Sequence, residues 1–265
     1  MSHGVLVGKT VVVTGAASGI GAAVAELARS QGGSVIGLDR DTSTGCGELD
    51  LSDETSIDAV LASLPSTIDV LCNVAGVPGT KPDQLVLAVN LSGLRHLTLG
   101  LRARLVGGSV VNVASTAGSQ WPSVLDEINE VLATTSMGDG AAWLEESSLE
   151  MDTYNFSKAA LIVWSMRTAW EWRDVGPRIN CVSPGAVDTP ILGDFHASMG
   201  PILGAVSALV GRDGRPEDIA PAVCFLASSA STWINGVNLI ADGGFAGGMA
   251  SGAVEVAALL GGGGS

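Results

Sequence analysis

The chain has 265 residues, 46% of them hydrophobic, which is enough apolar sequence for one large core, and we expect a single domain over residues 1–260. Its formal charge of −14, with only 13 lysines and arginines, argues against nucleic acid as a partner, because phosphate backbones are bound by clustered basic side chains. No apolar run reaches the roughly 18 residues that a membrane crossing needs and no signal peptide is recognisable, so we expect a cytoplasmic protein without a membrane partner.

Short runs rich in valine and isoleucine alternate with helical stretches along the chain. They predict strands within residues 9–16, 34–40, 47–51, 68–76, 107–115, 178–185 and 236–244. Strands joined by helical crossovers form parallel sheets that are covered on both faces. The sequence therefore predicts an α/β fold, a doubly wound parallel sheet of seven strands.

The first crossover is predicted to be a helix over residues 20–30, with Ile20, Val24, Leu27 and Ala28 on one stripe. Between Asp39 and residue 50 the chain is too short for a crossover helix, and we expect a loop there.

Residues 119–153 are predicted to be a helical insertion. It carries two helix-like pieces, 122–135 and 140–150, separated by a predicted breaker, MGDG, at 137–140. Residues 193–211 are mostly small and apolar, and either a mobile lid over a substrate, spanning 190–215, or a plain pair of surface helices accounts for them. The final GGGGS, 261–265, has the composition of a flexible tail.

The run VVVTGAASGIG places Gly15, Gly19 and Gly21 between the first strand and its helix. Glycines at such a turn allow close approach of a pyrophosphate, which the helix N-terminus stabilises. Asp39 ends the second strand, where it is placed to accept hydrogen bonds from an adenosine ribose and to repel a 2′-phosphate. The pattern favours NAD over NADP, and Arg40 is the one neighbour that weakens this preference.

Tyr154 and Lys158 are four residues apart in a predicted helix, so their side chains lie on one face. A nearby ammonium lowers the pKa of a phenol and makes it a usable general base. Taken alone, such a pair is more often a half-buried tyrosine beside a surface lysine. The four cysteines and three histidines are dispersed, so we expect small core thiols and no metal site.

These motifs together resemble the short-chain dehydrogenase/reductase family. The resemblance rests on TGAASGIG, NVAG at 73–76, Asn90, Ser115, YNFSK at 154–158, and Pro184-Gly185 with Thr189, and it spans nearly the whole chain. It implies a Rossmann-type fold and reversible oxidation of an alcohol to an aldehyde or ketone with NAD. It also implies a homo-oligomer, a dimer or a tetramer.

By the same resemblance, Ser115 polarises the substrate oxygen, Tyr154 is the acid/base, Lys158 holds the nicotinamide ribose and acidifies Tyr154, and Asn90 supports a proton-relay water. The residues implied to bind the cofactor are Gly15, Ser18, Gly19, Ile20, Gly21, Asp39, Arg40, Asp50, Leu51, Asn73, Ala75, Gly76, Tyr154, Lys158, Pro184, Gly185, Val187 and Thr189.

The insertion sets the chain apart from most of the family, because Ser115 and Tyr154 are thirty-nine residues apart. Segments in or beside it, such as SQWP and AWLEES, resemble bacterial family members that oxidise coniferyl alcohol, which implies an aryl-allylic alcohol as substrate. The alternative is a broad 3α-hydroxysteroid dehydrogenase/carbonyl reductase, a subgroup with a similar insertion. Trp121, Trp143 and Trp164 either form an apolar wall for the alcohol or pack in the core.

Two readings of other classes remain. A non-catalytic NAD-binding scaffold has no need of Ser115, Tyr154 and Lys158 together. A dehydratase or epimerase that recycles bound NAD would show no net cofactor turnover.

Overall fold

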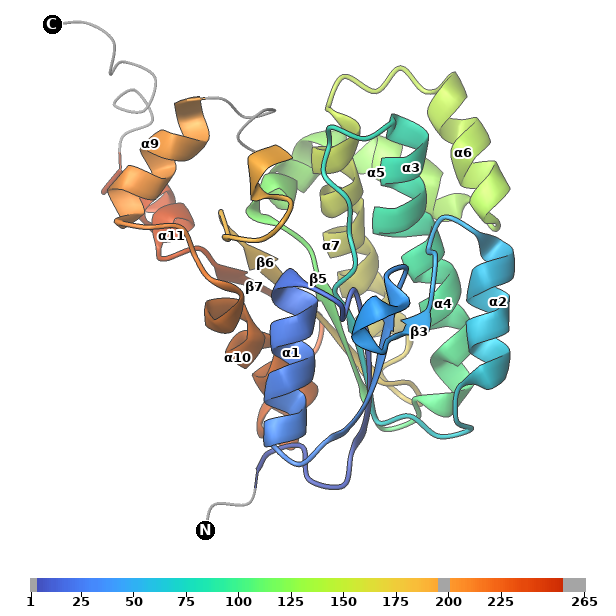
Figure 1. Cartoon of the computed structure of the whole chain (residues 1–265). Coiled ribbons are helices and arrows are strands. Elements are labelled where there is room, and N and C mark those ends of the chain that lie inside the picture. Colours follow the sequence, from blue (N-terminus) through green and yellow to red (C-terminus); the bar gives the residue numbers. More distant parts are fainter. Residues whose placement is uncertain (1–3, 195–200, 255–265) are drawn as a thin grey trace, which may run out of the picture.

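A parallel sheet is the centre of the computed structural model, which describes residues 4–194 and 201–254 (Figure 1). In the described part the sheet has seven strands in the order β3-β2-β1-β4-β5-β6-β7. Their bounds are β1 Thr10–Thr14, β2 Ser34–Asp39, β3 Gly47–Glu48, β4 Val70–Asn73, β5 Ser109–Val113, β6 Arg178–Pro184 and β7 Asn238–Ala241. Every neighbouring pair is parallel, so the predicted fold and all the predicted strands are confirmed.

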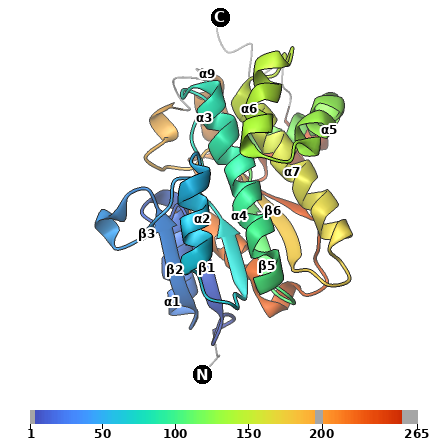
Figure 2. The ribbon, with the colours of Figure 1, turned by 90° about the vertical axis from the view of Figure 1, so that its right-hand side faces the viewer.

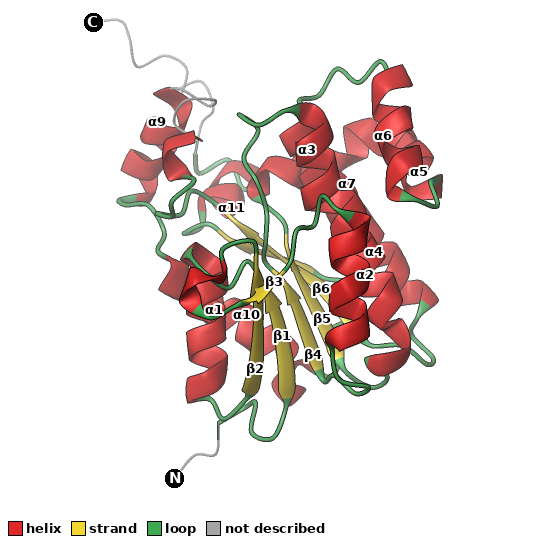
Figure 3. Ribbon diagram, turned by 45° about the vertical axis from the view of Figure 1, so that its right-hand side comes forward, coloured by secondary structure: helices red, strands yellow, loops and turns green. Residues whose placement is uncertain are grey.

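Helices cover both faces of this sheet. Helix α1 (Gly19–Ser30) packs beside α10 (Pro216–Ala227) on one face, while α2 (Glu54–Ser63), α4 (Gly93–Leu101) and α7 (Thr153–Glu171) cover the other (Figures 2 and 3). Side chains alternate along a strand, so Val11 and Val13 pack with α1 and α10 whereas Val12 packs with α2 and α4. A central strand buried on both faces explains the unbroken apolar run in the sequence.

The predicted stripe on α1 faces the sheet. Val24 and Ala28 are buried, and Ile20 and Leu27 pack against the same core. Between Asp39 and Asp50 the chain forms a short 3₁₀ turn, η1 (Thr42–Thr44), and the two-residue strand β3, so the expected loop without a crossover helix is confirmed.

The crossover after β4 is one long helical segment with an irregular centre. It consists of α3 (Asp83–Leu87), the π-helical turn η2 (Ala88–Ser92) and α4, followed by the 3₁₀ turn η3 (Arg102–Arg104). A π-turn inside an α-helix is rare and often marks a functional position. Asn90 lies in this turn.

The insertion folds as the 3₁₀ segment η4 (Thr116–Val124), α5 (Leu125–Ala133) and α6 (Met137–Glu146). The prediction of two helical pieces is confirmed, but the predicted breaker MGDG is wrong, because it forms the first turn of α6. Ser136 caps that turn and exchanges hydrogen bonds with Asp139, which offsets the low helix propensity of the two glycines. The chain instead breaks at 134–136.

A partly buried arginine anchors the insertion to the rest of the fold. Arg95, on α4, donates hydrogen bonds to the carbonyl oxygens of Val131 at 3.3 Å, Leu132 at 3.0 Å and Thr134 at 3.4 Å. These carbonyls lie at or just beyond the C-terminal end of α5, where the last carbonyls of a helix lack intrahelical partners, and the Val131 oxygen also accepts from the amide and hydroxyl of Thr134. One guanidinium therefore helps to satisfy the end of the inserted helix.

The C-terminal part contains α9 (Pro201–Val210), α10, the 3₁₀ turn η5 (Ser229–Ser231), β7 and α11 (Phe245–Ala250). The predicted lid, 190–215, is held at its base, where Val187 pairs with Gly214 and the Asp188 amide donates to the Gly214 carbonyl. Part of this lid, 195–200, and the predicted tail, 261–265, lie outside the described residues.

Cys72, Cys181 and Cys224 are buried, as predicted for core thiols, and Cys46 is partly exposed. Within residues 4–194 and 201–254, no group of histidine, cysteine or acidic side chains could hold a metal ion. In the same ranges, no helix has the length and apolarity of a membrane span.

Candidate active site

The glycine-rich turn lies where a dinucleotide phosphate would need room. Gly15 has a φ of +71°, and a Cβ there would lie 2.8 Å from the Cα of Ala75. A Cβ on Gly21 would lie 2.0 Å from the carbonyl oxygen of Gly15, so only glycine lets α1 start this close to the turn. The Ser18 side chain makes no capping bond and the first turn of α1 carries no acid, which fits a bound anion.

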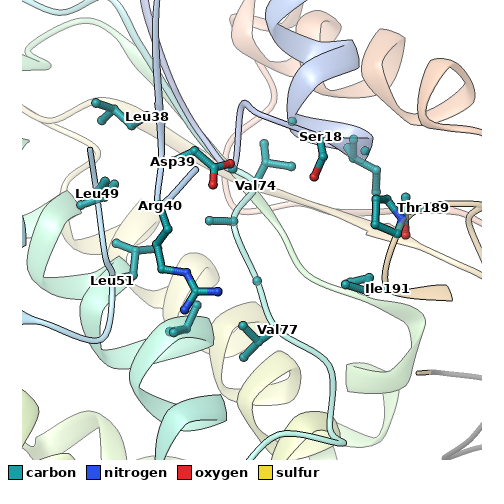
Figure 4. A pocket seen from close by; sticks show the side chains of 18 of the residues that line it. Ser18, Leu38, Asp39, Arg40, Leu49, Leu51, Val74, Val77, Thr189 and Ile191 are labelled. Atoms are coloured by element: carbon teal, nitrogen blue, oxygen red, sulfur yellow. The ribbon is translucent and has the colours of Figure 1, made fainter. Parts of the chain in front are cut away.

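A cavity opens beyond this turn, over the carboxyl ends of β1, β2 and β4 (Figure 4). Twelve of the predicted cofactor residues line it: Gly15, Ser18, Gly19, Ile20, Gly21, Asp39, Arg40, Asp50, Leu51, Ala75, Gly76 and Thr189. The structure thus brings together residues that are spread over most of the sequence.

Asp39 is held rigidly at this cavity. Its two carboxylate oxygens accept hydrogen bonds from the backbone amides of Ala17 and Asp41, each at 3.0 Å. Arg40 extends along the cavity next to it (Figure 4). Burial acts to raise the pKa of Asp50, but hydrogen bonds from Ser52 and the charge of Arg40 outweigh it and hold the pKa below its usual value.

Asn73 lies away from the cavity, although the sequence predicted that it binds the cofactor. Its side chain is fully buried and donates to Thr98 Oγ1 at 2.9 Å and to Asn112 Oδ1 at 2.8 Å, and it is absent from the lining of the cavity. As the last residue of β4 it points into the helix layer and ties the strand end to α4 and β5. The neighbouring Ala75 and Gly76 line the cavity instead.

A second cavity contains three of the four residues that were predicted to be catalytic. Ser115, Tyr154 and Lys158 line it together with Pro184, Gly185, Val187 and Thr189. Six residues line both cavities, which therefore form one continuous cleft: Ile20, Val74, Gly76, Val77, Thr189 and Ile191. Ser115 follows β5 and Tyr154 lies in the first turn of α7, so two packed elements hold the hydroxyls.

The pKa values of Tyr154 and Lys158 differ from the expectation. Burial raises the pKa of Tyr154 to about 12, and a hydrogen bond with the Ser115 hydroxyl only partly opposes this rise. The ammonium of Lys158 lies 5.8 Å from the centre of the Tyr154 ring, and burial lowers its own pKa to about 8. The prediction that Lys158 brings the phenol close to working pH is wrong for the protein alone, because burial disfavours both charged forms.

Gly118 lets these elements approach each other. A Cβ on it would lie 2.6 Å from the backbone carbon of Lys158, so α7 rests directly on the turn that follows Ser115. This glycine was missed in the sequence, although its place three residues after Ser115 is a usable signal.

Asn90 has a positioning role in this structure. Its side chain accepts a hydrogen bond from the Val77 amide at 2.9 Å and donates to the Val77 carbonyl at 3.0 Å and to Ser157 Oγ at 3.4 Å. It is buried behind the cleft, so it fixes the loop that carries Val77. The predicted relay water stays a prediction.

Sequence reasoning missed much of the apolar lining. The residues without a predicted role are Leu38, Leu49, Val74, Val77, Val89, Val113, Ala114, Thr116, Ala117 and Ala186, while Pro190, Ile191 and Leu192 belong to the predicted lid. Most of them are neighbours of predicted residues at strand ends, which is the only signal they carry.

The three tryptophans pack in the core, which is one of the two roles expected for them. Trp164 is buried in the core between α7 and the insertion, and Trp143 stacks on Phe156 with ring centres 5.2 Å apart and donates to Glu130 at 3.0 Å. Trp121 packs partly buried against the same cluster. The predicted aromatic wall is therefore not part of the described cleft, which is lined mostly by aliphatic side chains.

Comparisons with known proteins point in one direction. A family model described as enoyl-(acyl carrier protein) reductase matches residues 15–246. A coniferyl-alcohol dehydrogenase from a Pseudomonas species is 41% identical over 249 residues, which cover 91% of this chain and 98% of that protein. A 3-alpha-hydroxysteroid dehydrogenase/carbonyl reductase from Comamonas testosteroni is 28% identical over 244 residues, which cover 88% of this chain and 95% of that protein.

One solved structure is similar over almost its whole length. It is the 3-alpha-hydroxysteroid dehydrogenase of a Pseudomonas species in complex with NADH, with a TM-score of 0.78 and 31% identity, covering 91% of this chain and 98% of that chain.

Proposed function

The chain belongs to the short-chain dehydrogenase/reductase family as an oxidoreductase of the alcohol-dehydrogenase type, and we propose that it reversibly oxidises an aryl-allylic alcohol such as coniferyl alcohol with NAD. The observation that carries this proposal is the meeting of Ser115, Tyr154 and Lys158 on one apolar cavity that continues into the glycine-rich cleft.

The cleft fits a nicotinamide dinucleotide. The α1 N-terminus and the space around Gly15 and Gly21 would hold the pyrophosphate, and Asp39 would accept from the adenosine ribose. When bound, NAD supplies the hydride acceptor and a positive charge near the phenol.

The reacting alcohol is positioned by two hydroxyls. Ser115 Oγ would hold the substrate oxygen and stabilise the charge that develops on it, while Tyr154 Oη takes the proton as the carbinol is oxidised. In the opposite direction the phenol returns this proton to the carbonyl oxygen.

Lys158 would act on both the cofactor and Tyr154 without touching the reacting alcohol. Its ammonium donates to the Val113 carbonyl at 3.1 Å and lines the catalytic cavity, which leaves two further protons for a ligand. There they can bind a ribose hydroxyl, and the retained positive charge favours the phenolate.

The choice of an aryl-allylic alcohol rests on similarity to the coniferyl-alcohol dehydrogenase and on the mostly apolar lining of the cavity beside Tyr154. A second candidate is a 3α-hydroxysteroid dehydrogenase/carbonyl reductase, favoured by the similar NADH-bound structure. The predicted homo-oligomer stays a prediction, which the mass of the protein in solution would test.

The experiment is direct. Purified protein with coniferyl alcohol and NAD⁺ should form NADH faster than with a steroid alcohol at the same concentration. A faster steroid reaction would favour the second candidate. No NADH from a panel of aromatic, terpenoid and steroid alcohols would remove the proposal.

A further inference from the structure

Two loops stand on opposite sides of Ser115. The first, residues 74–82, follows β4 and is called the β4 loop; the second, residues 185–194, follows β6 and is called the β6 loop. Because β5 lies between β4 and β6 in the sheet, the two loops leave the sheet on either side of the strand that leads to Ser115.

Both loops line the cleft with their inner residues. Val77 of the β4 loop and Thr189 and Ile191 of the β6 loop border both cavities, at the point where one passes into the other. Val77 and Ile191 lie at the same end of the first cavity in Figure 4. Any movement of one loop away from the other would therefore widen the cleft where cofactor and alcohol meet.

A side-chain hydrogen bond joins the two loops. Thr80 Oγ1 donates to Asp194 Oδ1 at 2.7 Å, across 114 positions of sequence. Thr80 lies three residues beyond Val77, and Asp194 lies two residues beyond Leu192, which also lines the catalytic cavity. The bond thus connects the outer rims of the two walls.

The β4 loop is shaped to present Thr80. The Lys81 amide donates to the Pro78 carbonyl at 3.2 Å and closes a turn, and Pro78 and Pro82 restrict the backbone on both sides. In the same turn, a Cβ on Gly79 would lie 3.0 Å from the Cβ of Tyr154. The turn that holds Thr80 therefore passes directly over the tyrosine.

The bond between Thr80 and Asp194 combines a charged acceptor with exposure to water. A hydroxyl that donates to a carboxylate makes a charge-assisted bond, yet this one is exposed, so water competes for both groups. A contact of this kind can break and re-form once per turnover, as the closure of an active site requires.

We propose that Thr80 and Asp194 are a positioning pair that holds the β4 loop and the β6 loop together over the bound ligands and slows their release. The proposal rests on the proposed function only in taking a nicotinamide dinucleotide as the ligand. Neither side chain touches the reacting atoms, so the pair is expected to act on release and not on hydride transfer.

The test measures NADH dissociation by stopped-flow fluorescence, with no alcohol present. Thr80→Val keeps the shape of the side chain and removes the donor, and Asp194→Ala removes the acceptor. Each should raise the dissociation rate roughly two- to tenfold, the range expected for one hydrogen bond of ordinary net strength. Thr80→Ser keeps the hydroxyl and should stay close to the wild-type rate.

A double variant separates this bond from a general loosening. If both residues act through one contact, Thr80→Val with Asp194→Ala should release NADH no faster than the faster single variant. The proposal would be overturned if the two single effects on the dissociation rate multiplied in the double variant. It would also be overturned by a wild-type rate for Thr80→Val, or by an equal rise in rate for Thr80→Ser and Thr80→Val. Because the assay needs only binding, absence of NADH binding by the wild type would instead contradict the proposed cofactor.

A second readout uses the protein without ligand. Hydrogen exchange of the backbone amides at 79–81 and 189–194 should be faster in Thr80→Val than in Thr80→Ser, while amides of β5 should be unchanged. Equal exchange in the two variants would contradict the role of the bond.

Discussion

The ammonium of Lys158 donates a hydrogen bond of 3.1 Å to the carbonyl oxygen of Val113, the last residue of β5. Ser115 follows this strand by two residues, and Tyr154 lies one helical turn before Lys158. The bond therefore links the two elements that carry the catalytic hydroxyls, even though the whole insertion separates them in sequence.

The burial of Lys158 predicts a dependence of stability on pH. Its pKa is lowered from 10.5 to about 8 in the folded protein, so between these values the unfolded chain binds more protons and stability rises with pH. Between about pH 7 and about pH 9.5 the wild type should gain about 2 kcal/mol in free energy of unfolding relative to Lys158→Met. Tyr154, whose pKa is raised, adds no slope until pH nears its unfolded value of 10.

Urea unfolding at several pH values measures this difference. Lys81→Met removes an exposed lysine and is the matched control, which should keep the wild-type profile. A constant difference between wild type and Lys158→Met across the window would contradict the lowered pKa.

Tyr154 is the only tyrosine of the chain, so its ionisation can be observed directly. Burial raises its pKa to about 12, and the phenolate absorbance of the folded protein should therefore be nearly absent at about pH 10, where an exposed tyrosine is half ionised. Spectrophotometric titration of native and urea-unfolded protein checks this. Half ionisation of Tyr154 near pH 10 in the native protein would show that burial does not raise its pKa.

Removing the phenolic hydroxyl should stop the chemistry while leaving the fold. Tyr154→Phe should lower kcat for alcohol oxidation by roughly 10²- to 10⁴-fold, the contribution that a general acid–base group makes. NADH binding and the thermal unfolding temperature should stay close to wild type. A kcat within a few-fold of wild type would mean that another group moves the proton.

Gly118 provides a test of packing beneath the site. A Cβ at this position would lie 2.6 Å from backbone atoms of α7, so Gly118→Ala should cost about 1–3 kcal/mol of stability and should reduce kcat by separating Ser115 from Tyr154. Gly138→Ala is the control, because this exposed glycine of α6 has its nearest neighbour at 3.8 Å and the change should slightly stabilise the protein. Denaturant unfolding measures the stability of both variants. Equal free energies of unfolding for Gly118→Ala and Gly138→Ala would contradict the tight contact at Gly118.

The carboxylate of Asp39 predicts the cofactor preference. Asp39→Asn keeps the shape and loses the charge, so the ratio of kcat/KM for NAD⁺ to that for NADP⁺ should fall roughly tenfold or more, as expected when a charged hydrogen bond and the repulsion of a 2′-phosphate are lost. Initial rates with both cofactors measure the ratio. Glu48→Gln removes a nearby exposed carboxylate outside the cleft and should leave the ratio unchanged.

Local signals in the sequence were sufficient for the sheet and the glycine-rich cleft. Alternating apolar strands and their glycine turns report on backbone geometry within a few residues, and this is why the sequence alone assigns Gly15, Gly21 and Asp39 to the cleft. The same reasoning failed at MGDG, where the Ser136 cap and tertiary packing of α6 outweigh low helix propensity.

Burial and long-range contacts could not be derived in this way. The direction of the Tyr154 pKa depends on how completely neighbouring elements cover the ring, and the side-chain direction of Asn73 depends on which layer lies behind β4. The bond between Thr80 and Asp194 depends on two loops that share no sequence pattern. Each of these features arises only when distant segments are placed in three dimensions.

The three hydrogen bonds from Arg95 to the end of α5 constrain how this enzyme could gain or lose its extra helices. Deleting the inserted segment would remove all three carbonyl acceptors of this partly buried guanidinium. The residue at position 95 and the inserted helices are thus coupled through direct contacts.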